Sequence, residues 1–443
     1  MVPQLQQETE IAPSPSRIRW SLPTRIGFRF VLSYFFLYLT PGAVGSLGLN
    51  ETVTSYHAWF SAFWQQVVPW AGAHFLGLPA GLREIPNGSG DQLYDYVLIL
   101  CIFVTAVIIT VVWSLLDRKR QNYEQLYQWF RLFLRLFLAS VMMLYGASKL
   151  FPMQFAPIPL GRLVDPLGRL SPLGLLWGFM GYSRLYTLFG GIGEMLGGIL
   201  LIVPRFTTLG ALVSFAVLSN VLMLNLAYDV PRKIFTIHLM IIAALLILPA
   251  SKRLADFFIF NRTVKPEAEA PFMKDKLINK GVFALQYIYA IVTLAIALQV
   301  SYRLSIPNLA EVKAPLRGVW AVDQFQINSV LMPPDTHNDR RWHHVIFDRP
   351  DIFTIQPSSG GLQIFSLKID NSNRAFTSFD IDNPNSKASF TLVLPDNDHM
   401  SMKGQIGGQP VSTTLHRVDL SNPTEFLLLN RGFHWVTPAP RWR

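Results

Sequence analysis

Six polar side chains lie inside apolar stretches of this 443-residue sequence, where ionisable and amide groups are costly and therefore informative. A lysine and a glutamate among them would pair electrostatically, and the remaining groups offer hydrogen bonds to a ligand carbonyl or hydroxyl. A quinone suits such a pocket, because apolar walls hold its ring while a few polar groups orient it. The six are Tyr145, Lys149, Glu194, Asn220, Asn225 and His238.

Helix geometry places these six residues at a similar depth. At about 1.5 Å rise per residue, all six fall in the outer half of a bilayer, and Asp229, Arg232 and Lys233 form a charged rim on the same side. Two interpretations stay open. The residues line a polar pocket that faces the outer leaflet, or they satisfy one another and hold the helices together.

The elements that must carry these residues are membrane-spanning helices. The sequence is 51% hydrophobic and only 15% charged, against roughly 25% charged residues in soluble domains. A spanning helix needs about 20 mostly apolar residues. Seven segments meet this need: 27–48, 95–115, 130–150, 187–204, 208–228, 233–250 and 281–302. The sequence therefore predicts an α-helical membrane bundle.

The distribution of charge predicts an orientation. The whole net charge of +10 lies in residues 1–309, where basic residues flank apolar segments. Basic loops stay in the cytoplasm, so we expect a cytoplasmic tail over 1–25 in a bacterial inner-membrane protein. With seven spans, the C-terminal domain is expected on the periplasmic side. Binding to nucleic acid is not expected, because the charges do not cluster on one soluble module.

The segments between the spans complete the predicted organisation. Two N-terminal spans and an outer loop occupy 26–125, and aromatic residues at helical spacing in 55–79 indicate a helix lying in the interface. The outer loop 151–186 contains a short apolar stretch that is expected to dip into the membrane. The predicted parts that follow are a helical core at 126–260, a cytoplasmic linker at 261–280, a seventh span at 281–303 and a β domain at 310–443.

The β domain is predicted from alternating segments bounded by turn residues. Its short connections favour an eight-stranded antiparallel up-and-down barrel over a sandwich. Gly318-x-Trp320 before a late Arg431 resembles the lipocalin kind of barrel, in which such an arginine stacks on the tryptophan. A ligand cavity and a filled barrel both stay open. The strands are predicted at 320–327, 342–347, 352–356, 362–369, 375–381, 388–394, 400–406 and 411–418.

Several kinds of chemistry are disfavoured. Cys101 is the only cysteine, which excludes an intramolecular disulfide and dithiol catalysis. His238 is the only histidine within a predicted span, so two axial haem ligands facing each other across spanning helices are not available. His343 and His344 are neighbours on one predicted strand and point to opposite faces. No metal site and no nucleophile motif is predicted.

Residues 140–258 resemble the DoxX-like membrane family. The resemblance lies in the run from Tyr145 to Leu150 (YGASKL), in Gly190–Leu201 (GGIGEMLGGILL), in Phe206–Ala211 (FTTLGA) and in Asn220–Lys233 (NVLMLNLAYDVPRK). It implies a four-helix core formed by spans three to six. It also implies a link to quinone-dependent or other membrane redox complexes, and no catalytic residue is carried over.

Three functions follow from these expectations. The first is a DoxX-like subunit that supports a quinone-linked redox reaction, with a redox partner protein. The second is a non-catalytic protein whose outer β domain captures a lipophilic molecule or partner. The third is a structural anchor in the lipid bilayer. The sequence leaves open whether the protein is an enzyme.

Overall fold

A computed structural model describes residues 19–46, 50–79, 81–85, 90–265, 276–311, 316–334, 338–370, 375–379, 387–422 and 424–430. The chain divides into two compact units. Unit 1 comprises Met1–Met142, Leu196–Leu226 and Val230–Val292, and unit 2 comprises Met143–Met195, Ala227–Asp229 and Thr293–Arg443.

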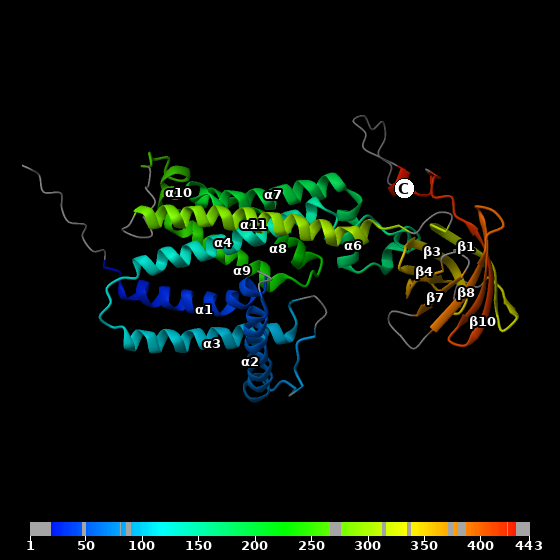
Figure 1. Cartoon of the computed structure of the whole chain (residues 1–443), viewed down its shortest axis with the longest axis horizontal. Helices are drawn as coiled ribbons and strands as arrows, with labels where there is room; N and C mark the ends of the chain where they lie inside the picture. The colour runs from blue at the N-terminus through cyan, green and yellow to red at the C-terminus, as the bar shows by residue number, and fades with distance from the viewer. Residues whose placement is uncertain are drawn as a thin grey trace, which may run out of the picture. The chain divides into compact units, whose positions relative to one another are not determined.

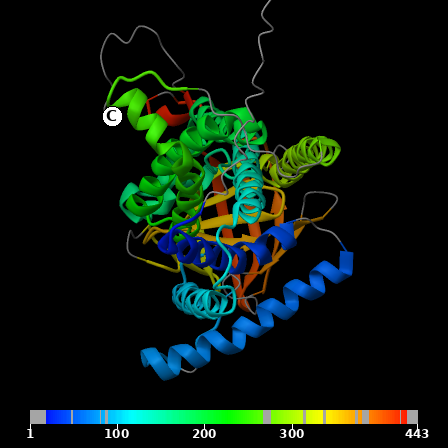
Figure 2. The same cartoon turned by 90° about the vertical axis from the view of Figure 1, so that its left-hand side faces the viewer.

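Unit 1 begins with three helices that pack against one another. Helices α1 (Leu22–Ser46) and α3 (Leu93–Leu116) run side by side, and α2 (Asn50–Leu76) crosses them at a steep angle (Figures 1 and 2). Trp64 and Val68 of α2 are buried against α3, whereas Trp59 and Trp70 are exposed. The segment predicted to lie in the interface is thus a helix with one packed side and one exposed aromatic side.

The remaining long helices correspond to the predicted spans. Among the described residues, six helical segments are long and apolar enough to cross a membrane, by length and composition: α3, α4, α7, η2 with α8, α9 with η3 and α10, and α11. Their elements are α4 (Glu124–Leu150), α7 (Arg184–Ile202), η2 (Pro204–Phe206), α8 (Thr207–Ala227), α9 (Lys233–Ile247), η3 (Leu248–Ala250), α10 (Ser251–Phe258) and α11 (Lys276–Leu309). The protein is therefore a multi-helix membrane protein.

The first predicted span differs from the other six. Residues 27–46 of this predicted span fall on α1, and 47–48 lie outside the described residues. Helix α1 is not one of the six qualifying segments among the described residues. It carries Arg25 and Arg29 near its start, and side chains beyond Leu39 lie outside the described part. The placement of the C-terminal domain outside the cell rests on seven spans, so it stays a prediction.

The loop between α4 and α7 is folded onto the β domain within unit 2. It contains α5 (Leu160–Val164), η1 (Leu167–Arg169) and α6 (Pro172–Tyr182). The backbone N–H of Leu160 donates to Asp348 Oδ2 at 2.9 Å, and Gln356 Nε2 donates to the carbonyl of Val164 at 2.9 Å. At the end of α11, Asn308 Nδ2 donates to the carbonyl of Pro152 at 2.9 Å. These contacts hold this loop, the end of α11 and the barrel together within unit 2.

The β domain is a nearly closed antiparallel barrel. Its strand order is β5-β4-β3-β1-β10-β9-β8-β7-β6, and β2 pairs with β1. The strands are β1 (Gly318–Ile327), β2 (Val330–Met332), β3 (Trp342–Arg349), β4 (Ile352–Pro357), β5 (Gln363–Ser366), β6 (Lys368–Ile369), β7 (Ala375–Phe379), β8 (Lys387–Val393), β9 (His399–Ile406) and β10 (Gln409–Arg417), with a short helix α12 (Leu427–Asn430) after them.

The strand number differs from the predicted eight for two local reasons. Residues 362–369 form β5 and β6, separated by Leu367, whose N–H donates to the carbonyl of Asp351. Residues 330–332 form β2, joined to β1 by Asn328 and Ser329, whose φ angles are both positive, as tight hairpin turns require. The chain segment with β5 and β6 pairs with β4 at one end and β7 at the other, and this brings the two ends of the sheet together in a nearly closed barrel.

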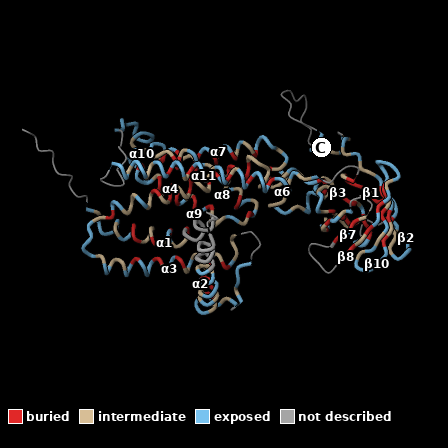
Figure 3. Tube along the Cα trace, in the orientation of Figure 1, coloured by how far each residue is buried: buried red, intermediate tan, exposed pale blue. Residues whose placement is uncertain are grey.

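The interior of the barrel is filled by apolar side chains. Inward positions alternate with exposed ones along β8 and β10 (Figure 3), and burial of each such side chain contributes about 1.5–3 kcal/mol. The rings of Phe353 and Phe365 stack at 5.0 Å between centroids, and those of Phe376 and Phe353 meet edge-on at 5.0 Å.

An arginine of β10 stacks on the tryptophan that opens the first strand. The guanidinium carbon of Arg417 lies 4.6 Å from the ring centroid of Trp320. Arg431 lies outside the described residues. The register of β10 against β1 places Arg417 opposite Trp320, and the sequence alone did not single out this arginine.

Candidate functional site

Lys149 and Glu194 form an ion pair buried between two helices. Lys149 Nζ donates to both carboxylate oxygens of Glu194, at 2.9 Å to Oε1 and 2.7 Å to Oε2. The two side chains are 8% and 1% exposed. Taking two charges out of water costs several kcal/mol each, and only close geometry with further hydrogen bonds repays it. The predicted electrostatic pairing of these residues is confirmed.

Glycines on both helices let α4 and α7 approach closely enough for this ion pair to form. A Cβ on Gly191 of α7 would lie 2.8 Å from Lys149 Cβ, and a Cβ on Gly146 of α4 would lie 2.7 Å from the Gly191 carbonyl oxygen. Any larger residue would push the helices apart. These glycines therefore act in close helix packing.

Aromatic rings surround the ammonium group of Lys149. Its Nζ lies 5.7 Å from the Tyr145 ring centroid and 5.8 Å from that of Phe155, within the range of cation–π attraction. The Phe155 ring in turn meets the Trp177 ring at 5.2 Å. The guanidinium of Arg184 donates to the Lys149 carbonyl at 2.8 Å. The pair is thus enclosed by rings and by a capped helix end.

The two asparagines of α8 do not share a role. Asn225 is buried and its Nδ2 donates to Thr236 Oγ1 of α9 at 3.0 Å. Asn220 is exposed. Five residues along an α-helix rotate the side chain by about 140°, so the two amides face different directions. Asn220 therefore does not join Asn225 in a common pocket.

His238 pairs with a tyrosine that the sequence analysis did not select. Its Nδ1 lies 2.7 Å from the Ile234 carbonyl oxygen and its Nε2 lies 2.7 Å from the Tyr34 hydroxyl. A carbonyl only accepts, so Nδ1 carries the proton and Nε2 accepts from Tyr34. The Tyr38 ring stacks on the imidazole at 4.0 Å. Sequence alone could not find this pairing, because α1 and α9 are far apart in the chain.

The charged rim contains a helix cap, formed by Asp91, that the sequence did not predict. Asp91 Oδ2 accepts from the backbone N–H of Lys233 at 2.6 Å, and Oδ1 accepts from that of Ile234 at 2.9 Å. Its carboxylate also lies 4.0 Å from Lys233 Nζ. A carboxylate at a helix N-terminus is stabilised by the unsatisfied amides there. The Thr236 hydroxyl donates to the backbone carbonyl of Arg232. Asp229 is exposed and its φ angle is positive.

The predicted site residues fall into separate groups. Tyr145, Lys149 and Glu194 belong to unit 2, together with Asp229, whereas the two asparagines, His238, Arg232 and Lys233 belong to unit 1. Within unit 2 the charge pair and the Tyr145 ring are together. Within unit 1, Asn225 contacts the first turn of α9, and His238 contacts α1. Most of these side chains are hydrogen-bonded to protein partners.

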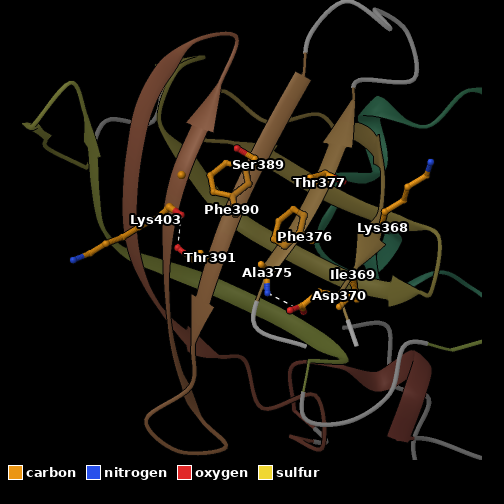
Figure 4. Close-up of a pocket in the computed structure, with 11 residues that line it drawn as sticks. Lys368, Ile369, Asp370, Ala375, Phe376, Thr377, Ser389, Phe390, Thr391 and Lys403 are labelled. Atoms are coloured by element: carbon orange, nitrogen blue, oxygen red, sulfur yellow. Dashed lines mark hydrogen bonds between the residues drawn. The ribbon is translucent and has the colours of Figure 1, made fainter. Parts of the chain in front are cut away.

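The wall of the barrel contains an open cavity of about 560 Å³. The rings of Phe376 and Phe390 lie next to each other there, with centroids 5.3 Å apart, and Lys368 and Lys403 extend away from them on either side (Figure 4). Ser389 also lines the cavity. Both rings are only 2% exposed and belong to the core of the barrel, so they border the cavity from the side of the interior.

The paired histidines His343 and His344 are neighbours on β3. Across the described residues there is no group of three or more histidine, cysteine, aspartate or glutamate side chains that could hold a metal ion. His344 Nδ1 lies 2.7 Å from Gln356 Oε1. Burial lowers the pKa of His344 below its usual value of 6.5, with His343 and His416 adding to this effect and the bond to Gln356 opposing it.

These features define a class: a helical membrane protein with an antiparallel barrel and a buried charge pair between close-packed helices. Comparison with known proteins then gives a relative. The chain is 32% identical over 115 residues to the uncharacterised protein YwoB of Bacillus subtilis (strain 168), and the match covers 26% of this chain and 71% of YwoB. The chain belongs to the same family as YwoB. No family model and no solved structure matches it.

Proposed function

We propose that this protein is a DoxX-like membrane subunit that supports a quinone-linked redox process, with the Lys149–Glu194 pair next to the quinone. The observation that carries the proposal is the burial of this pair, with exposed fractions of 8% and 1%. Ionisable groups within a membrane-spanning bundle are costly, and such groups commonly mark ion, proton or ligand sites.

The surroundings of the pair support a flat aromatic ligand. Tyr145 and Phe155 place their rings within 6 Å of the Lys149 ammonium, and apolar walls with a few polar groups suit a quinone ring. The Lys149 ammonium would act as a hydrogen-bond donor to a quinone carbonyl, and the Glu194 carboxylate would stay as its counter-ion. The redox chemistry itself would come from the quinone and a partner protein.

The experiment is quinone extraction from the purified full-length protein, combined with native mass spectrometry. We expect close to one quinone per wild-type chain and about a tenfold loss in Glu194→Gln. Ser140→Ala serves as the matched control, because it removes a polar contact to Tyr289 elsewhere on α4. The proposal is wrong if wild-type protein purifies without quinone, or if folded Glu194→Gln retains it fully.

The second candidate function is capture of a lipophilic ligand by a lipocalin-like outer barrel. Its support is the open cavity of about 560 Å³ beside Phe376 and Phe390. Ser389→Trp would fill this cavity, whereas Val393→Trp on the same strand adds the ring at an exposed position. Loss of binding of a fluorescent fatty acid in the first variant alone supports this function. Equal binding in both variants contradicts it.

A further inference from the structure

Two cavities of unit 2 meet at one arginine. Each has a volume of about 620 Å³, and both are lined by Pro159 and Arg162. The first lies along α6, and the second lies between the α5–η1 segment and strands β3 and β4. We propose that together they bind one anionic phospholipid, with acyl chains along α6 and the headgroup between α5 and the barrel.

The cavity along α6 has the character of an acyl-chain site. Its lining is dominated by leucines and the rings of Trp177, Phe179 and Tyr182. Leu167, Phe179 and Tyr182 are 70%, 54% and 48% exposed. Apolar surface of this extent is unfavourable in water, and a membrane supplies hydrocarbon chains to cover it.

The second cavity has the character of a headgroup site. Arg162, Arg169 and Arg349 line it together with Asp165 and Asp348, which leaves one positive charge in excess among the lining residues. Arg349 is itself paired with Asp351 at 3.0 Å. Asp348 is occupied by the backbone N–H of Leu160. Arginine binds phosphate through parallel hydrogen bonds and remains charged at any physiological pH. A phosphodiester is therefore the complementary group.

Arg162 lies at the junction because α6 leaves room for it. A Cβ on Gly174 would lie 3.6 Å from Arg162 Nη2, so the guanidinium rests against the first turn of α6. Ser171 caps this helix by accepting from the Gly174 N–H at 3.0 Å. The positive end of the helix dipole favours an anion here. The junction thus offers two positive features to one phosphate.

Asp165 adds a requirement for a hydroxyl donor. Its side chain is 5% exposed and pairs with Arg162 at 3.2 Å through Oδ2. Its Oδ1 is buried and accepts no hydrogen bond from the described residues. An unsatisfied buried acceptor is costly, and a glycerol headgroup carries hydroxyls that can donate to it. Phosphatidylglycerol combines these hydroxyls with the negative charge.

The test compares lipids on the full-length protein by native mass spectrometry in nanodiscs. We expect wild-type protein to retain phosphatidylglycerol in preference to phosphatidylcholine. Arg162→Gln should weaken this retention about fivefold, in line with one basic residue at an anionic lipid. Arg262→Gln is the matched control, because Arg262 is an exposed arginine paired with Asp256 outside both cavities.

A second variant guards against misfolding of Arg162→Gln. Gly178 lines the apolar cavity, and a Cβ there would meet no atom within 4 Å. Gly178→Leu should therefore fold and obstruct the acyl chains, whereas Gly27→Leu, also in open space, should leave retention unchanged. Equal retention of both lipids, or full retention in Gly178→Leu, overturns the proposal.

A competition with inorganic phosphate separates the two parts of the site. If phosphate alone displaces the lipid at equal concentration, the apolar cavity contributes nothing and a lipid is not the ligand. The same spectra report any bound quinone. This inference rests on neither proposed function, so loss of quinone with retained phosphatidylglycerol, or the reverse, tells the two apart.

Discussion

Gly191 lies so close to Lys149 that a Cβ on the glycine would come 2.8 Å from the lysine Cβ. A methyl group at this position has to separate α4 from α7 and lengthen the contact between Lys149 and Glu194. We expect Gly191→Ala to destabilise the protein by about 1–3 kcal/mol, as overpacking commonly does. A thermal unfolding curve in detergent measures this directly.

The matched control for this glycine is Gly27 of α1, where a Cβ would meet nothing within 4 Å. Alanine is the better helix former by about 1 kcal/mol, so Gly27→Ala should leave the unfolding temperature unchanged or raise it. If Gly191→Ala also leaves the unfolding temperature unchanged or raises it, the close contact between the helices does not contribute to stability.

The ion pair itself should show strong coupling between its two residues. Lys149→Met or Glu194→Leu alone leaves a buried charge without its partner, which costs about 3–5 kcal/mol. The double variant removes both charges and should recover much of this loss. A double-mutant cycle on unfolding free energies measures the coupling. Additive losses would mean that the two side chains do not stabilise each other.

The barrel should lose stability in mild acid through His344. Its pKa is lowered in the folded barrel, chiefly by burial, whereas the unfolded chain takes up a proton near the usual value of 6.5. The contribution is therefore complete above pH 6.5 and is lost as the pH falls below it. Hydrogen exchange of β3 and β4 at pH 7.5 and 5.5 measures the change as protection factors.

Replacement of the buried histidine should remove this dependence. His344→Gln has no titrating group in that pH range, so its protection factors should change less between the two pH values. His399→Gln on β9 is the control, because His399 is exposed and should leave the wild-type dependence in place. An unchanged dependence in His344→Gln would assign the effect to another group.

The contact between the α4–α7 loop and the barrel predicts a shared side of the membrane. Arg169 donates to the Ser359 carbonyl on the β4–β5 turn. Cysteines introduced at Leu167 and at Ser359, in a Cys101→Ser background, should both react with an impermeant maleimide from one side. A cysteine at Lys119, before α4, should react only from the other side. Labelling of Leu167 and Ser359 from opposite sides would contradict this arrangement.

Sequence periodicity was enough to locate most elements. Alternation of apolar and polar residues predicts a strand at 342–347, because such alternation reports which positions face a core. The structure has β3 at Trp342–Arg349. The length of the apolar segments predicts the positions of α3, α4, α7, α8, α9 and α11. The predicted single strand at 362–369 became two, since the break at Leu367 depends on pairing with separate neighbours.

The candidate site was predicted less completely, because its partners are distant in sequence. Lys149 and Glu194 were paired correctly from their charges and depth. Tyr34 lies 204 residues from His238, and Asp91 lies 142 residues from Lys233, so neither contact leaves a local signal. Asn220 shows a second limit of prediction from sequence, which concerns the direction of a side chain. Its depth was estimated, yet depth does not say which face of α8 it occupies.

The two ends of the barrel sheet meet in the short segment around Leu367, where β5 pairs with β4 and β6 pairs with β7. Along the described strands, little backbone is therefore left for an incoming chain to extend the sheet. A protein that recruits this domain has to recognise outward side chains or the turns, such as Gly407–Gly408. Its specificity would then lie in surface chemistry instead of main-chain pairing.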